Sequence, residues 1–248
     1  MYRCVRLKGG FLLAVLCMAA LSLPFVLGGS VPAQSVMAGS PVVYLTFDDG
    51  PSEATPALLQ ALDEVGVKAS FFVTAQNPDC FGYAAQAHEA GHLLCAHTAS
   101  HDFAKIYASE SAFWQDIDEV NDMITAITGA PATILRFAGG SSNTLARRYG
   151  GSGLMRALTE GCGERGFVYV DWNVDTGDGV EALSAETIAR RAVKGAQGKP
   201  HAVILMHDGT SKNSAADAVR ILVPQLREMG CSFATLDTLP VEVHHTLP

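Results

Sequence analysis

The sequence predicts an α/β fold in which a single domain is built on a mainly parallel sheet, and three observations support this. About seven short runs rich in β-branched and aromatic residues alternate with stretches of helical periodicity, which is typical of parallel βαβ units. At 248 residues and 48% hydrophobic composition, the chain can bury one full core. No repeat, charge run or low-complexity tract follows Pro41. A closed barrel and an open doubly wound sheet both satisfy these observations.

The predicted strands are short and lie along the whole domain. The first ends at Asp48-Asp49-Gly50-Pro51, a sequence typical of turns. Several candidate chemical residues follow such runs, and in parallel barrels the active site is built at the C-terminal ends of the strands. Strands are expected at residues 42–47, 68–74, 92–97, 133–137, 167–173, 202–206 and 233–236.

Helices are expected between these strands. Thr55 and Pro56 suit the N-cap and first position of a helix that runs to about residue 65. A second helix is expected at residues 82–90, and the clearest one at 109–128. The apolar stripe of that third helix, and the residues that close it, are Phe113, Ile117, Val120, Ile124 and Ile127, then Gly129 and Pro131. The side chains expected to cap later helices are those of Ser184 and Ser214.

The N-terminal residues resemble an export segment. Three basic residues precede the uncharged apolar run 11–27, whose length lies between the cores of cleaved signals, about 7 to 15 residues, and membrane-spanning helices, about 17 to 25. Both interpretations stay open. The basic residues lie before the run, so the rest of the chain is expected outside the cytoplasm, secreted or anchored. The expected organisation is 1–28 as signal peptide or membrane anchor, 29–41 as linker, 42–240 as folded domain and 241–248 as C-terminal tail.

The charge balance bears on partners. The formal net charge is −8, and three of the basic residues lie in the export segment, so the domain is more acidic still. Nucleic acid is not expected as a partner, because phosphate binding needs a basic face. Membrane contact is expected only through the N-terminal segment, and the protein is expected to be a monomer.

The cysteines do not form a recognisable framework. Four of them, Cys80, Cys95, Cys162 and Cys231, lie beyond the export segment, and no CxxC pair occurs. Buried free thiols and a single disulfide are both consistent with this spacing.

Asp48 and Asp49 are adjacent carboxylates directly after a predicted strand. Like charges at this distance repel and raise a pKa unless a cation holds them. A metal ion would do so, whereas an ordinary acidic turn is the plainer interpretation of the pair alone.

His97 and His101 are separated by four positions in His97-Thr98-Ala99-Ser100-His101. This spacing can place both imidazoles on one ion, although the two could also be surface residues. With a carboxylate from another strand end they complete a set of two histidines and one carboxylate. Such a set suits Zn²⁺, and also Co²⁺, Ni²⁺ or Fe²⁺.

Five motifs in order now resemble a known family. Asp48-Asp49-Gly50-Pro51, then His97-Thr98-Ala99-Ser100-His101, Arg136-Phe137-Ala138-Gly139-Gly140, Asp171-Trp172 and Leu205-Met206-His207-Asp208 are similar to those of the polysaccharide deacetylases, carbohydrate esterase family 4. The likeness covers about residues 42–238. It implies an irregular (β/α) barrel and metal-dependent removal of acetyl groups from N-acetylated sugars.

The resemblance also implies roles for individual residues. Asp49, His97 and His101 would hold one divalent metal ion, with zinc expected. Asp48 would be the general base toward the attacking water, and His207 would protonate the departing amine. The backbone N–H of Gly139 would stabilise the oxyanion.

Supporting residues are implied in the same way. Asp171 would keep His207 charged, and Arg136 would orient Asp48. Trp172 and Leu205 would line the pocket for the acetyl methyl group, although both types are common in plain cores. The family often has proline where this chain has Ala138, and we expect altered rates at most from that departure.

Several substrates fit the motifs. Peptidoglycan N-acetylglucosamine is the first expectation because the protein is exported. Chitooligosaccharide, an exopolysaccharide and O-acetyl xylan are alternatives. A catalytically silent wall-binding module and a metal-assisted amidase acting on a small amide are the rivals from other classes.

Overall fold

The computed structural model describes residues 39–208 and 214–248. The predicted export segment and most of the predicted linker lie outside these residues. Within them, no helix combines the length and the apolar character that a membrane span requires.

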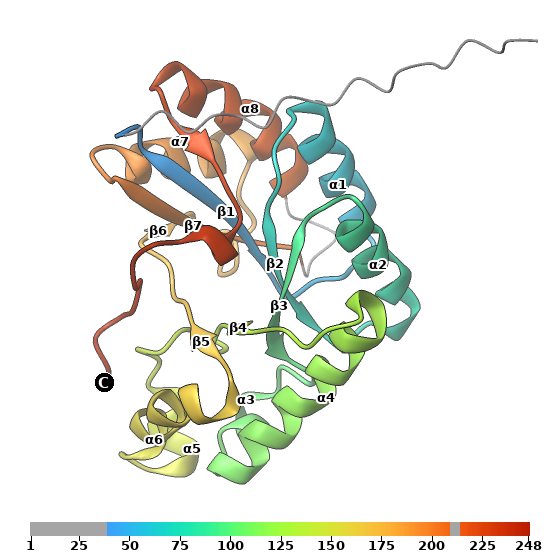
Figure 1. The fold of residues 1–248 in the computed structure, drawn as a ribbon. Helices are drawn as coiled ribbons and strands as arrows, with labels where there is room; N and C mark the ends of the chain where they lie inside the picture. The colour runs from blue at the N-terminus through green and yellow to red at the C-terminus, as the bar shows by residue number, and fades with distance from the viewer. Residues whose placement is uncertain (1–38, 209–213) are drawn as a thin grey trace, which may run out of the picture. The chain divides into compact units, whose positions relative to one another are not determined.

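The sheet consists of parallel strands in the order β5-β4-β3-β2-β1-β7-β6, with β8 paired to the start of β1. Figure 1 shows the sheet curling, with helices on its outer side and β5 and β6 at its two ends. The irregular (β/α) barrel is therefore confirmed, in an incomplete form. The strands are β1 (Val42–Asp48), β2 (Ser70–Thr74), β3 (Leu93–Thr98), β4 (Ile134–Leu135), β5 (Val168–Tyr169), β6 (Val174–Asp175), β7 (His201–His207) and β8 (Ser232–Phe233).

The strand expected at residues 167–173 is wrong as a single element. Val170 N–H still donates to the carbonyl of Leu135 on β4, whereas Asn173 N–H donates to that of Val203 on β7. The chain therefore crosses between the two ends of the sheet at Asp171 and Trp172. The side-chain amide of Asn173 also binds β7, accepting from Val203 N and donating to His201 O, and this pairing draws the chain to the far edge.

The helices largely follow the prediction, but two caps do not. Ser184 caps its helix as expected, accepting from Thr187 N, whereas Ser109, expected as the first helical residue, is the N-cap and accepts from Ala112 N. Thr55 lies inside its helix, and its hydroxyl donates to Asp208. Ser214 stands at the expected N-cap position, but its hydroxyl donates to Leu183 O and makes no capping hydrogen bond. The helices are α1 (Thr55–Glu64), α2 (Phe81–Glu89), α3 (Phe103–Ile106), α4 (Glu110–Thr128), α5 (Leu145–Gly150), α6 (Leu154–Gly161), α7 (Ala185–Ala196) and α8 (Ala215–Glu228).

The two faces of β1 show where a site can form. Leu45 and Phe47 point outward into the core beneath the helices, and alternate residues point into the barrel. There, Val42 and Tyr44 belong to a small apolar core, whereas Thr46 and Asp48 beyond them are polar and buried. The barrel interior is thus apolar at the start of the strands and polar at their C-terminal ends.

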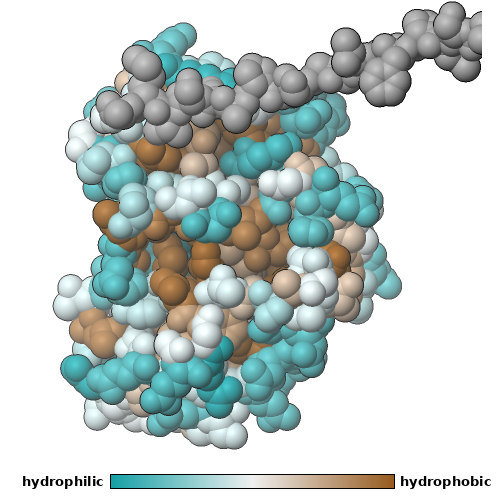
Figure 2. All heavy atoms as spheres, in the orientation of Figure 1, coloured by the Kyte–Doolittle hydropathy of each residue, from teal (hydrophilic) through white to brown (hydrophobic). Residues whose placement is uncertain are grey.

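Apolar side chains also reach the surface. Figure 2 shows them gathered over the middle of the face drawn. The exposed large apolar residues include Val168 on β5 and Val241 in the C-terminal segment. The cysteines named above are buried free thiols, so the disulfide alternative is not supported.

Candidate active site

Asp48 and Asp49 end β1 with carboxylates in different surroundings. Asp48 is 3% exposed and lies inside the barrel, where its Oδ1 accepts from Arg136 Nη1 at 2.7 Å. Asp49 has a backbone φ of 71°, in the left-handed region, which is costly for a residue with a side chain, by about 1–2 kcal/mol. This backbone turn separates the two carboxylates, so one faces an arginine and the other faces histidines.

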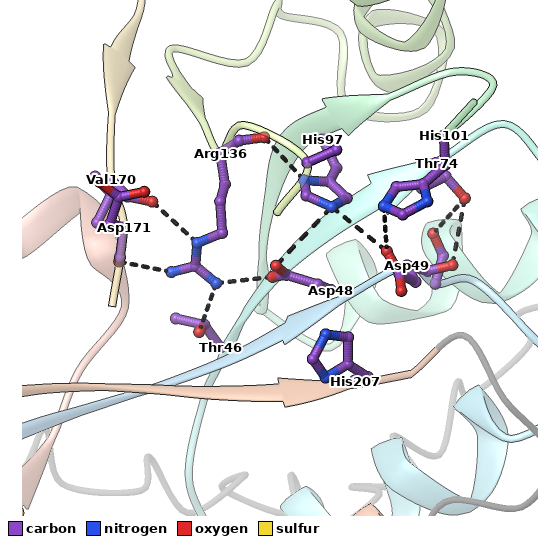
Figure 3. Close-up of polar contacts among 12 residues, drawn as sticks. Thr46, Asp48, Asp49, Thr74, His97, His101, Arg136, Val170, Asp171 and His207 are labelled. Carbon is purple, nitrogen blue, oxygen red and sulfur yellow. Dashed lines mark hydrogen bonds and ion pairs between the residues drawn. The ribbon is translucent and has the colours of Figure 1, made fainter. Parts of the chain in front are cut away.

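Asp49, His97 and His101 form a cluster able to hold a metal ion, with one ligand atom from each within 4.8 Å of the others. Asp49 Oδ1 lies 3.4 Å from His97 Nε2 and 3.2 Å from His101 Nε2 (Figure 3). Ligand atoms placed tetrahedrally about 2.0–2.2 Å from one ion are about 3.3–3.6 Å apart. Asp49 Oδ1 is also buried without a hydrogen-bond partner in the described part of the chain. The donor set therefore fits a divalent ion.

The environment keeps Asp49 ionised. Burial works against its charge, but the nearby imidazoles of His97 and His101 hold the pKa of Asp49 well below its usual range. A carboxylate in that state is ready to act as a metal ligand.

His97 and His101 are each positioned by a separate set of contacts. The His97 ring donates from Nδ1 to the Arg136 carbonyl at 2.8 Å, which leaves Nε2 toward Asp49. The pairing of β2 with β3 shifts register beside His97, as in a β-bulge, and bulges re-aim side chains. His101 has a φ of 48°. The turn before it is fixed by Asp116, whose carboxylate accepts from the backbone of Ala99 and from Ser100.

Arg136 is fully buried and joins the site to the barrel wall. It donates to the carbonyls of Val170 and Asp171 and to the hydroxyl of Thr46, besides its pair with Asp48. Its guanidinium stacks on the Phe72 ring at 4.0 Å. Because these contacts fix the guanidinium plane, they also hold the Asp48 carboxylate in place, while the role of Arg136 in the reaction stays a prediction.

His207 ends β7 and pairs with a residue that the sequence reasoning missed. Its Nδ1 lies 2.9 Å from Asp178 Oδ1, and its backbone N–H donates to Asp178 Oδ2. Burial opposes the charge, but the Asp178 hydrogen bond and the nearby Asp48 raise the pKa of His207 to about 9. A side chain on Gly179 would collide with the imidazole, so this glycine lets the Asp178 loop pack flat on the ring.

Asp171 does not take the predicted place beside His207. Its carboxylate is fully buried and accepts from Ser141 N at 2.9 Å, from the Ser141 hydroxyl and from His245 N at 2.7 Å. The expected Asp171–His207 pair is therefore wrong. The strand crossing explains the error, since it directs Asp171 toward the loop after β4 and leaves Asp178, beyond β6, to face His207.

The structure places the other predicted residues close to this site. Gly139 has a φ of 75° and lies in the loop that Ser141 ties to Asp171. Trp172 is half-buried beside Gly140. Leu205 is buried on β7, in register with Thr46 on β1. Their roles as oxyanion donor and acetyl pocket stay predictions.

Two further residues could have been found from sequence. Asp116 lies on the predicted apolar stripe of α4, next to Ile117, and a carboxylate on a buried helical face indicates a specific partner. Asp178 follows a strand-like run, as Asp48 does, in Asp175-Thr176-Gly177-Asp178. Ser141 and His245 gave no such signal, because they meet Asp171 only in the folded chain, 30 and 74 positions away in sequence.

Comparisons with known proteins support the family that the motifs indicate. The polysaccharide deacetylase family pattern matches residues 36–152. A peptidoglycan-N-acetylglucosamine deacetylase of Bacillus cereus is 34% identical over 199 residues, which are 77% of this chain and 68% of that protein. The chain belongs to the polysaccharide deacetylase family. It is therefore an enzyme of the hydrolase class, as its motifs predict.

Two more relatives bear on fold and substrate. The catalytic domain of a peptidoglycan N-acetylglucosamine deacetylase from Eubacterium rectale has a TM-score of 0.81 and 38% identity, over 88% of this chain and 98% of that domain. A chitooligosaccharide deacetylase of Rhizobium leguminosarum bv. trifolii is 28% identical, over 78% of this chain and 89% of that protein.

Proposed function

We propose that this polysaccharide deacetylase hydrolyses the N-acetyl groups of peptidoglycan N-acetylglucosamine and releases acetate. The observation that carries the proposal is the arrangement of the site: an Asp-His-His cluster on one side, His207 on the other, and the Arg136-bound Asp48 among them (Figure 3). The relatives from Bacillus cereus and Eubacterium rectale, both named for this substrate, support the choice of sugar.

Asp49, His97 and His101 would hold the metal ion, and we propose zinc. Two imidazoles and a carboxylate suit Zn²⁺, with Co²⁺, Ni²⁺ and Fe²⁺ as alternatives. A bound divalent ion would polarise the acetyl carbonyl and lower the pKa of a water from about 15.7 toward neutrality.

Asp48 would take a proton from the attacking water. Arg136 holds this carboxylate in place, so the base does not have to be oriented during the reaction. The oxygen of the water forms the new bond to the acetyl carbon, and the backbone N–H of Gly139 would donate to the carbonyl oxygen as it becomes negative.

His207 would supply the other proton. Its Nδ1 is held by Asp178, and the protonated imidazole would donate a proton to the amine nitrogen as the C–N bond breaks. Because its pKa is raised to about 9, His207 is protonated at neutral pH. Trp172 and Leu205 would enclose the acetyl methyl group.

We further propose that the protein works outside the cytoplasm as a monomer, either secreted or anchored by its N-terminal segment. The apolar run that follows the basic N-terminal residues supports this, together with relatives that are named for a cell-wall substrate.

Acetate release tests the proposed function. The Zn²⁺-loaded protein is incubated with peptidoglycan and, separately, with chitooligosaccharides, each with and without chelator. We expect chelator-sensitive release from peptidoglycan. Faster release from chitooligosaccharides would favour the alternative that the Rhizobium relative supports, and no release with metal bound would favour a silent wall-binding module.

A further inference from the structure

In the loop after β4, two side chains form hydrogen bonds to the carbonyl of one peptide unit. We propose that Tyr107 and Asn143 clamp the carbonyl of Ala138 and thereby aim the N–H of Gly139 at the reacting acetyl group. Both would be positioning residues, and the role in catalysis rests on the proposed function above.

The Tyr107 hydroxyl is the first half of the clamp. It donates to Ala138 O at 2.8 Å from a fully buried side chain. Burial raises the pKa of Tyr107, so the hydroxyl remains a donor throughout the working pH range.

Asn143 is the second half. Its Nδ2 lies 3.2 Å from Ala138 O, 3.2 Å from the Tyr107 hydroxyl and 2.6 Å from Gly140 O. Its Oδ1 accepts from Ala146 N at the start of α5, which fixes the amide plane. The Ala138 carbonyl is therefore held from a second side, and the clamp itself is anchored to a helix.

Because a peptide bond is planar, holding the Ala138 carbonyl also sets the direction of the Gly139 N–H. The carbonyl of Ala138 and the N–H of Gly139 belong to one planar unit, and in a trans peptide they point in opposite directions. Fixing the carbonyl toward Tyr107 and Asn143 thus fixes the N–H toward the other side. Gly139 has a φ of 75°, in the region that favours glycine, and Asn143 and Phe103 lie close to it. Because glycine has no side chain, nothing on this residue hinders the approach of the acetyl group.

The clamp also accounts for alanine at position 138. A proline there would restrict the backbone by fixing φ. In this chain the restriction comes instead from hydrogen bonds on the far side of the same peptide. We therefore interpret Ala138 as a residue whose ordering has been taken over by Tyr107 and Asn143.

Tyr107 further connects this loop to the metal ligands. It directly follows α3, the short helix after His101, and Phe103 of that helix contacts both rings, with centroids 5.2 Å from His101 and 6.1 Å from Tyr107. One compact unit thus positions a metal ligand and the oxyanion donor, the two groups that would face the same carbonyl oxygen.

The test is Tyr107→Phe, which removes one hydroxyl and keeps the ring. Loss of a whole oxyanion donor costs about 10²–10³-fold in kcat, so loosening one should cost about tenfold, with KM within about twofold and metal content unchanged. Tyr44→Phe is the matched control, because it removes the hydroxyl of another buried tyrosine, which lies in the small apolar core with Val42 and away from this loop. The assay uses the substrate from which the wild type releases acetate.

A loss of kcat confined to Tyr107→Phe would support the clamp. Wild-type kcat in that variant, or an equal loss in Tyr44→Phe, would overturn it. If the wild type releases no acetate, the proposed function fails, and hydrogen exchange of the amides in residues 139–143 decides the clamp separately. Several-fold faster exchange in Tyr107→Phe than in Tyr44→Phe supports it, and equal rates refute it.

Discussion

The two sides of the site differ in how complete they are. The metal side, Asp49, His97 and His101, contains a buried carboxylate oxygen without a hydrogen-bond partner among the described residues. On the acid side, the His207 imidazole and the Asp178 carboxylate form an ion pair at 2.9 Å. The backbone N–H of His207 also donates to the Asp178 carboxylate. The first arrangement needs a ligand to satisfy it, whereas the second is already satisfied by the protein.

Backbone strain follows the same division. Asp49 and His101 are the non-glycine residues with positive φ in the part of the chain that the structure describes. Such conformations cost free energy and persist where the surroundings hold them. Strain of this kind clusters at functional sites, and here it lies on the metal side, at Asp49 and His101, and not at His207 or Asp178.

Removal of a metal ligand should therefore have the largest effect. We expect His101→Ala to weaken metal binding by more than about 100-fold, because even supporting residues around a metal site are worth 10–100-fold. Metal titration followed by thermal melting measures this. The wild type should gain about 2.7 kcal/mol at a metal concentration 100 times its Kd, and the variant should gain almost nothing.

The exposed His244 serves as the control for that variant. Its ring stacks on Tyr169, far along the chain from the metal side. His244→Ala should retain the stabilisation by metal. A His101→Ala protein that binds metal as the wild type does would show that the cluster is not the metal site.

Asp48→Asn should have the next largest effect, and it separates chemistry from metal binding. The amide cannot accept the proton of the attacking water, so turnover should fall by about 10⁴-fold, the upper end for general base catalysis. Metal content should stay at the wild-type level, because Asp48 is not one of the three ligands. Acetate release and metal analysis on one preparation check both points, and a normal rate would refute the assignment of the base.

How well the sequence predicts the site also differs between the two sides. Asp49 directly follows β1, His97 lies near the end of β3 and His101 follows it. Both strands lie in the expected runs, so their motifs could be placed at strand ends. His207 ends β7, another long strand, and was predicted in the same way. Hydrophobic pattern and motif spacing are sufficient where a strand is long.

The partner of His207 was missed because the strands before it are short. β5 and β6 have two residues each, and such pairs leave little periodic signal. The side chain of Asn173 decides where the chain crosses the barrel, and this crossing moves Asp171 away from His207 and brings Asp178 to it. Contacts of this kind join residues far apart in sequence, so local pattern does not reveal them.

The smallest expected effect tests whether Asp178 or Asp171 raises the pKa of His207. Removing the charge beside His207 should let its pKa fall from about 9 toward the ordinary value of about 6.5. His207 must be protonated to act as the acid, so in Asp178→Asn the alkaline limb of the pH–rate profile should move to lower pH. The pair between His207 and Asp178 also makes the free energy of unfolding depend on pH. The pair stabilises the wild type fully below about pH 6.5, and this contribution is lost as pH rises through about 9.

Asp171→Asn is the matched control, since it neutralises a buried carboxylate that binds Ser141 and His245 instead. We expect it to lower stability and to loosen the oxyanion loop while the alkaline limb stays in place. Profiles of kcat/KM from pH 6 to about 10 distinguish the two variants. If the limb moved in Asp171→Asn and not in Asp178→Asn, the acid side would depend on the residue that the motif suggested, and the pairing described here would be wrong.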